Sequence, residues 1–175
     1  DLANDQHNVP TIIISTSDPL EAGIIKSAND SGYDHIHAGF DPTRYIRQLR
    51  LFHTIVQFER LGIIYEDSSV GKVYASLSDA EKVAKERGFE VVTRIARDDE
   101  MADTYKESEE DVVKAISELA PLVDAFYFTA HRGMTLEKIP EILQPFLEQK
   151  VFTWSQWGTE FVERGILFST VEDDY

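Results

Sequence analysis

Short apolar runs alternate with longer amphipathic segments along most of the chain. The plainest run, residues 61–65, reads LGIIY, which is typical of a buried strand. A segment of helical period follows over residues 70–87, and Gly88 supplies its stop signal. Further strands are predicted at 90–95, 124–129, 151–155 and 166–170, with helices between them that carry Val112, Val113, Ile116 and Leu119, and then Leu136, Ile139, Leu143 and Phe146. Strands separated by helices of this length predict an α/β fold with a mostly parallel sheet and helices on both faces.

A smaller set of elements precedes this series. Strands are predicted at residues 11–15 and 36–40. Asp18-Pro19 and Asp41-Pro42 both look like an N-cap followed by proline at the first helical position. The first pair predicts a short helix ending near residue 27. The second predicts a long helix whose inward side chains are Tyr45, Leu49, Phe52 and Val56.

Composition and charge narrow the classes of function. The formal net charge is −15, from 32 acidic and 17 basic residues, so the chain repels phosphate backbones and anionic lipid headgroups. We therefore expect no nucleic acid as a partner. The absence of cysteine excludes disulfides and thiol nucleophiles. No apolar run approaches the ~18 residues that a membrane-spanning helix needs. The chain opens on Asp1, which we interpret as a boundary within a longer protein.

Several motifs, in their order along the chain, resemble one family. They are Val9-Pro10-Thr11-Ile12-Ile13, Ser17-Asp18-Pro19 with Ala22-Gly23, Arg60-Leu61-Gly62-Ile63-Ile64-Tyr65, Asp124-Ala125-Phe126-Tyr127 and Glu163-Arg164-Gly165-Ile166-Leu167. In this order they resemble the ABC transporter substrate-binding proteins, in particular the subgroup that includes tryptophan and tyrosine receptors. The resemblance implies the type I periplasmic-binding-protein fold, in which two Rossmann-like, three-layer lobes close on a small ligand.

The resemblance also implies a domain organisation. Residues 1–59 would form the end of the first lobe and a crossover or hinge helix, and residues 60–175 a nearly complete second lobe. Two segments depart from the family pattern. The loop after Tyr65 reads Glu-Asp-Ser-Ser, and Thr129-Ala130-His131-Arg132 replaces a more usual acidic segment. These departures leave the ligand class open.

A ligand is expected beyond the carboxyl ends of the parallel strands, where helix N-termini and loop side chains converge. Ser68 and Ser69 could hold a carboxylate or could only cap the following helix, and Thr16 and Ser17 pose the same choice. Glu66, Asp67, Glu172 and Asp173 could neutralise an ammonium group or could be solvated. Trp154 fits the core better than a ligand site. The candidate ligand-binding residues are Thr16, Ser17, Asp18, Asp67, Ser68, Ser69, Thr129, His131, Gln156 and Trp157.

Other patterns point to ordinary structural roles. His35 and His37 alternate on a predicted strand and share one face, but no third metal ligand stands at suitable spacing. Residues 98–100, Asp-Asp-Glu, are interpreted as a solvated loop, and residues 107–111 as an acidic helix start. No nucleophile can be paired with a base, so no enzyme activity and no cofactor are expected.

The leading hypothesis is an extracytoplasmic, bacterial solute-binding receptor that presents a small polar or amino-acid-like ligand to the membrane permease of an ABC-type importer. Its location would be periplasmic or extracytoplasmic, with a lipid anchor on a segment upstream. The alternative keeps the fold as the ligand-sensing domain of a membrane-bound signalling protein. A cytoplasmic flavodoxin-like or receiver-like domain is disfavoured, because the acidic pair, phosphoacceptor Asp and Lys of a receiver do not line up.

Overall fold

The contacts within the chain divide it into two compact units, Asp1–Arg44 and Tyr45–Tyr175. The computed structural model describes residues 9–13, 19–20, 23–38, 41–98 and 105–170. Among these described residues, no helix combines the length and the hydrophobicity that crossing a membrane requires.

The second unit is built on one five-stranded sheet. Its strands are β3 (Arg60–Tyr65), β4 (Glu90–Ile95), β5 (Ala125–Phe128), β6 (Phe152–Ser155) and β7 (Phe168–Ser169). They lie in the order β4-β3-β5-β6-β7, and each neighbouring pair is parallel. The predicted parallel α/β architecture is therefore confirmed, although β7 is shorter than the predicted strand at 166–170.

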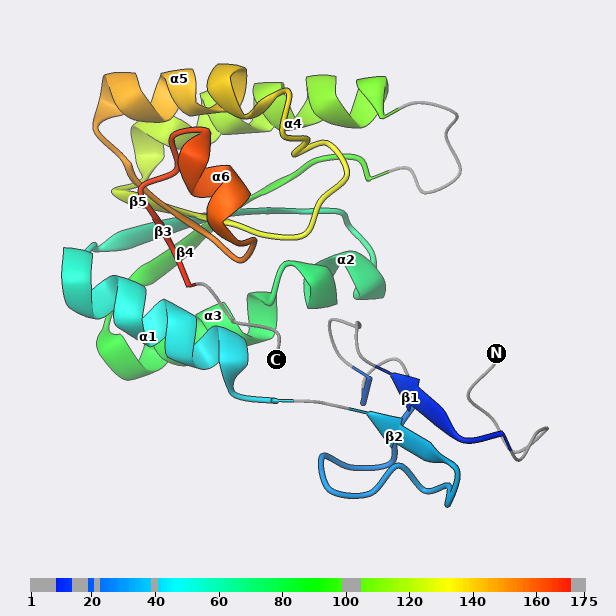
Figure 1. Ribbon diagram of the computed structural model, residues 1–175. Coiled ribbons are helices and arrows are strands. Elements are labelled where there is room, and N and C mark those ends of the chain that lie inside the picture. The colour runs from blue at the N-terminus through cyan, green and yellow to red at the C-terminus, as the bar shows by residue number, and fades with distance from the viewer. Residues whose placement is uncertain (1–8, 14–18, 21–22, 39–40, 99–104, 171–175) are drawn as a thin grey trace. The chain divides into compact units, whose positions relative to one another are not determined.

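Helices cover both faces of this sheet (Figure 1). α4 (Lys106–Leu119), which continues into the short η1 (Ala120–Leu122), and α5 (Ile139–Gln149) lie on one face. α1 (Arg44–Val56) and α3 (Leu77–Arg87) lie on the other. Strand side chains alternate between two cores: Ile64, Phe126 and Phe128 pack with α4 and α5, while Ile63 and Tyr127 pack with α1 and α3. Burial on both faces explains why these strands are apolar at consecutive positions.

Helix α1 begins at Arg44, two residues after the proline of the predicted start signal Asp41-Pro42, and Asp41 instead closes the turn that precedes the helix. The Oδ1 atom of Asp41 accepts hydrogen bonds from the Thr43 backbone N–H at 2.9 Å and from the Thr43 hydroxyl at 2.7 Å. Leu49 and Phe52 are fully buried in the core shared with β3, β5 and α3. α1 thus packs within the second compact unit, while the assignment of residues 1–59 and 60–175 to two lobes stays a prediction.

The helix predicted over residues 70–87 is interrupted. Two helices stand in its place, α2 (Ser69–Tyr74) and α3, and between them Ser76 adopts a left-handed conformation with φ 49° and ψ 37°. The prediction of one continuous helix was wrong. The apolar positions keep a helical period on both sides of the break, so the sequence pattern does not reveal it. The C-terminal stop at Gly88 is confirmed, with φ 82° at the helix end.

The first compact unit contains two short parallel strands, β1 (Thr11–Ile13) and β2 (Ile36–Ala38). The short helix predicted from Asp18 is not formed by the described residues of that segment, which make a turn instead. The backbone N–H groups of Ile24 and Ile25 both donate to the carbonyl of Pro19, at 2.8 and 3.1 Å, and Gly23 has φ 70°. These contacts close the chain on itself before a helical ladder can develop.

Candidate functional site

The order of the strands marks one position on the carboxyl edge of the sheet. The connection after β3 leads to β4 on one side, whereas β5, β6 and β7 extend the sheet on the other. In parallel α/β sheets, ligands bind outside the strand ends where the order reverses in this way. The segments that follow β3 and β5 flank this point, and they carry five of the candidate residues, Asp67, Ser68, Ser69, Thr129 and His131.

After β3, the chain turns directly into α2. The Ser68 hydroxyl accepts a hydrogen bond of 2.9 Å from the Gly71 backbone N–H, so Ser68 caps the helix. Ser69, the first residue of α2, is exposed. Asp67 is also exposed and forms an ion pair of 3.4 Å with Lys72, whose Nζ atom lies 5.8 Å from the ring centre of Tyr65. A carboxylate and a hydroxyl therefore face solvent at this point of the edge.

Close packing fixes the start of α2 against the end of β3. A Cβ atom on Gly71 would lie 2.2 Å from the carbonyl oxygen of Glu66, far closer than atoms can approach. Glycine is required here by space and not by a left-handed backbone. The start of α2 therefore packs closely against the residue that follows β3.

After β5, two candidate side chains point into the protein. Thr129 is fully buried, and its hydroxyl lies 3.5 Å from the carbonyl oxygen of Ile64. His131 is 8% exposed; its Nδ1 accepts a hydrogen bond of 3.1 Å from the Gly133 N–H. Its Nε2 lies 3.3 Å from the carbonyl oxygen of Ala96 and therefore donates the ring proton to it. Burial lowers the pKa of His131, and the charge of Asp98 opposes this effect only in part.

The same loop is held by a charged pair that sequence reasoning assigned differently. Asp98 is not solvated as predicted: its side chain is 8% exposed and lies 3.1 Å from the Arg132 guanidinium. Its Oδ1 also accepts a hydrogen bond of 3.3 Å from the Arg132 backbone N–H. The sequence does not reveal this ion pair, because Asp98 and Arg132 are far apart in the sequence and come together only when β4 and β5 lie in one sheet. Residues 99 and 100 of that acidic run lie outside the described residues.

After β6, the two tryptophans separate as expected. Trp154 is 2% exposed and packs between Phe52 and Phe168, which confirms its core role. Trp157 is 46% exposed and stacks on Phe161 at 6.0 Å with an interplanar angle of 12°. The Trp157 N–H donates to the Ser155 hydroxyl at 2.9 Å, and its carbonyl accepts from the Ser169 hydroxyl. An indole face is thus presented to solvent on a fixed backbone.

Gln156 lies beside Trp157 but is turned inward. It is 8% exposed, and its Nε2 donates a hydrogen bond of 2.8 Å to the hydroxyl of Ser76. Its backbone N–H donates to the Phe128 carbonyl at 2.9 Å and so extends the pairing of β5 and β6. Sequence reasoning missed Ser76, because nothing in an apparently continuous helix marks its break.

The structure brings seven of the ten candidate residues to one edge of the sheet. Asp67, Ser69 and Trp157 are exposed there, and Ser68 is half-buried. Thr129, His131 and Gln156 are buried, with polar atoms near partners within the protein. Thr16, Ser17 and Asp18 lie outside the described residues, as do Glu172 and Asp173. Contact of any of these residues with a ligand stays a prediction.

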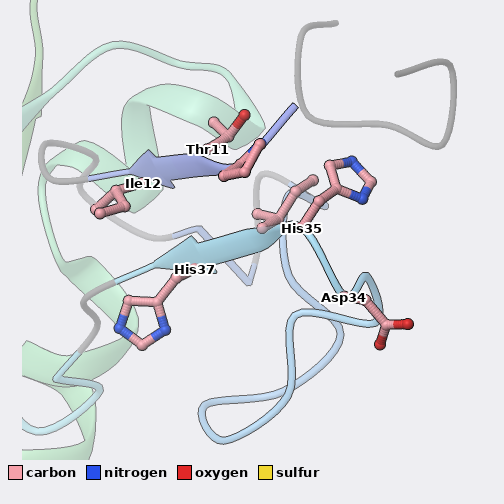
Figure 2. A pocket seen from close by; sticks show the side chains of 7 residues that line it. Thr11, Ile12, Asp34, His35 and His37 are labelled. Carbon is pink, nitrogen blue, oxygen red and sulfur yellow. The ribbon is translucent and has the colours of Figure 1, made fainter. Parts of the chain in front are cut away.

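A shallow hollow in the first unit contains the two histidines that alternate along the chain. Figure 2 shows His37 on β2 and His35 directly before this strand, with their rings directed away from each other. Within the parts of the chain that the structure describes, no cluster of three His, Cys, Asp or Glu side chains could hold a metal ion. The hollow therefore offers no convergent set of ligands.

The described residues of the carboxyl edge offer groups that can bind a small molecule. Both ring nitrogens of His131 are hydrogen-bonded to the backbone, so this residue is not placed to accept a proton from a solute. The exposed groups, a carboxylate, a hydroxyl and an indole face, can bind an ammonium group, a polar group and a flat or apolar surface. Such groups suit recognition of a small molecule.

Comparison with known proteins gives similarity at the level of structure. No protein-family model and no curated protein matches the sequence. A conserved domain protein from Vibrio cholerae O1 biovar El Tor is similar over 91% of this chain and 50% of its own, with 18% identity and a TM-score of 0.66. A substrate-binding protein with adhesive properties from Clostridium difficile, in a ligand-free, open form, is similar over 87% and 48%, with 19% identity and a TM-score of 0.59.

A protein from Rhodospirillum rubrum assigned as a branched-chain amino acid ABC transporter is also similar. The match covers 89% of this chain and 41% of that protein, with 14% identity and a TM-score of 0.50. The chain thus spans about half the length, or less, of the solved structures that it resembles. Over the part that is covered, it shares the parallel α/β fold of these structures; the two-lobed type I architecture and the tryptophan- and tyrosine-receptor subgroup stay predictions.

Proposed function

We propose that this chain forms part of an extracytoplasmic solute-binding receptor, which presents a small polar or amino-acid-like ligand to the membrane permease of an ABC-type importer. It has no catalytic role in this proposal. The solute lies against the carboxyl edge of the five-stranded sheet, beside Asp67, Ser69 and Trp157.

One observation carries the proposal. Segments that are far apart in the sequence, after β3, β5 and β6, lie at one edge of an all-parallel sheet, and the strand order reverses between β3 and β5. The fold similarity to a substrate-binding protein over 87% of the chain supports the same reading of that edge. The amino-acid-like ligand is suggested by the exposed carboxylate of Asp67, which complements an ammonium group, and by the hydroxyl of Ser69.

A titration followed by two-dimensional NMR tests the proposal on this chain. The standard L-amino acids are added singly at millimolar concentration. This concentration suits weak binding, which is expected because the chain spans about half the length of its structural neighbours and one lobe contacts only one side of a solute. We expect at least one of them to shift the Ser69 amide and the Trp157 indole signal. The indole of Trp154, which is 2% exposed in the core, serves as an internal control and stays in place.

A matched pair of variants locates the site. Trp157 and Phe152 are aromatic, 46% and 44% exposed, and lie beyond the carboxyl end and at the amino end of the same strand. Trp157→Ala is expected to weaken the binding of the amino acid identified in the titration, and Phe152→Ala to leave it unchanged. The proposal is contradicted if no amino acid shifts these signals. It is also contradicted if Phe152→Ala weakens binding and Trp157→Ala does not.

A further inference from the structure

The break between α2 and α3 is joined to a distant strand by one buried hydrogen bond. The Gln156 Nε2 atom, at the carboxyl end of β6, donates to the Ser76 hydroxyl at 2.8 Å. Ser76 and Gln156 are 5% and 8% exposed. β5 lies between β3, from which α2 continues, and β6, so the bond joins segments that follow two strands that are not neighbours in the sheet.

Ser76 occupies a conformation that a serine rarely adopts without support. Its left-handed backbone is strained relative to the right-handed helix, because the Cβ atom of a non-glycine residue then lies too close to the following carbonyl oxygen. Its backbone groups are nevertheless paired: the N–H donates to the Val73 carbonyl at 2.8 Å, and the carbonyl accepts from the Ala80 N–H at 3.0 Å. The side chain is the remaining polar group, and its hydroxyl oxygen accepts the hydrogen bond from Gln156.

Helix α2 itself is only partly buried, with Val73 and Tyr74 half-buried. Gly71 is its one buried residue, while Val70 is 59% exposed and the Lys72 side chain 49% exposed. Its start is fixed by the Ser68 cap and by the contact of Gly71 with Glu66. Its far end leads directly into Ser76 and therefore into the bond with Gln156.

Gln156 is itself fixed by the sheet. Its backbone N–H donates to the Phe128 carbonyl at 2.9 Å, and the next residue, Trp157, is held by the hydroxyls of Ser155 and Ser169. A displacement of Gln156 would therefore be felt at Trp157 through one peptide bond and at α2 through Ser76. Gln156 therefore links the two exposed parts of the candidate site, the start of α2 and Trp157.

We infer that Gln156 is a positioning residue that does not contact the ligand itself. Its buried amide holds Ser76 in the left-handed conformation at the break, and this keeps Ser68 and Ser69, at the start of α2, in a fixed position relative to Trp157. The inference rests on the proposed function for its effect on ligand binding. Its effect on α2 stands apart from that function and is measured separately.

Hydrogen exchange measures the effect on α2. The reporters are the amides of Lys72, Ala75 and Ser76, which donate within and just after this helix. In Gln156→Leu, which keeps a side chain of similar size but has no donor, we expect these amides to exchange roughly 5- to 30-fold faster, the factor that corresponds to the loss of one buried hydrogen bond. Gln149→Leu, at the exposed end of α5, is the matched control and leaves them unchanged.

A second variant guards against a general loss of folding. Ser76→Ala removes the same hydrogen bond from the other side and leaves Gln156 in place. If the bond acts as inferred, the effects of Gln156→Leu and Ser76→Ala on α2 exchange do not add in the double variant. Additive effects, or faster exchange spread evenly over the sheet, overturn the inference.

Ligand binding supplies the final readout, with the amino acid that shifts the wild-type spectrum used as the probe. We expect Gln156→Leu to weaken its binding several-fold while Gln149→Leu does not. Unchanged affinity together with faster α2 exchange overturns the role of Gln156 in the binding site. If no amino acid binds the wild-type chain, the proposed function fails, and exchange still decides whether Gln156 holds α2.

Discussion

Single residues at the carboxyl edge of the sheet divide into those that face solvent and those that hold the loops. His131 belongs to the second group, because both of its ring nitrogens are bonded to the backbone of neighbouring segments. Protonation of the ring places a hydrogen on Nδ1, which then cannot accept from the Gly133 N–H. The neutral form of His131 is therefore the form that the folded loop requires.

This requirement predicts a dependence of stability on pH. The folded-state pKa of His131 is lowered by burial, so this residue contributes stability above its unfolded-state pKa of about 6.5. That contribution is lost as the pH falls below 6.5 toward the lowered folded-state pKa. Denaturant unfolding at a series of pH values should show that the midpoint of the wild-type chain decreases over this window.

Two variants isolate the histidine from other titrating groups. His131→Gln, which cannot be protonated, is expected to be less stable at neutral pH but to lose less stability on acidification from pH 7 to pH 5. His37→Gln replaces an exposed histidine and should follow the wild-type profile. Equal pH profiles for wild type and His131→Gln would show that His131 is not the group responsible.

At the scale of elements, α2 depends on the space left by one glycine. In Gly71→Ala the new Cβ would meet the Glu66 carbonyl at 2.2 Å, so either the helix or the loop after β3 must move. We expect a loss of about 1–3 kcal/mol in the free energy of unfolding, the usual cost of overpacking. Gly158→Ala, at a second glycine of the same edge where nothing lies within 4 Å of the added atom, should change stability little.

The sequence predicted the elements whose character is set locally. Residues 61–65 are apolar at every position because β3 is buried on both faces, and Asp41-Pro42 marked the turn before α1 through a contact two residues away. The break at Ser76 escaped prediction because its support, Gln156, is 80 residues distant. A local pattern cannot report a hydrogen bond that exists only once the sheet has formed.

The position of the candidate site on the sheet was predicted from the sequence, but the direction of its side chains was not. The carboxyl ends of strands could be read from the sequence, so Ser69 and Trp157 were selected correctly as residues of that edge. The direction of each side chain could not, because Thr129, His131 and Gln156 turn inward to satisfy backbone and side-chain groups of other elements. Asp98 was misassigned for the same reason, since its partner Arg132 follows a different strand.

At the scale of the whole molecule, the second compact unit contains its own cores. One core lies on each face of the sheet, and both are made of residues between Ile46 and Phe168. A shortened chain of residues 41–170, which retains the Asp41 contact at the start of α1, is therefore expected to fold alone. Calorimetry should give one cooperative transition, and the amide spectrum should overlay on that of the full chain for β3 to β6. Broad, non-cooperative melting of the shortened chain would contradict this expectation.

The net charge of −15 predicts a response to salt. Like charges repel one another at low ionic strength, and screening over a Debye length of about 10 Å at 0.1 M relieves this repulsion. Raising NaCl from about 0.01 M to about 0.5 M should therefore raise the melting temperature. NaCl is preferable to sulfate, which also strengthens apolar burial. A melting temperature that falls with NaCl would mean that ion pairs such as Arg50–Glu86 outweigh the repulsion.

The strand order has a consequence for synthesis on the ribosome. β3 pairs with β4, which follows soon after it, and with β5, which begins at Ala125. While the chain is being made, β3 and β4 can pair early, but the second edge of β3 has no partner until β5 has left the exit tunnel. Leu61, Ile63 and Ile64 are completely buried in the finished protein. A nascent chain halted before Ala125 would therefore present an open, apolar strand edge, the kind of surface that chaperones shield from aggregation.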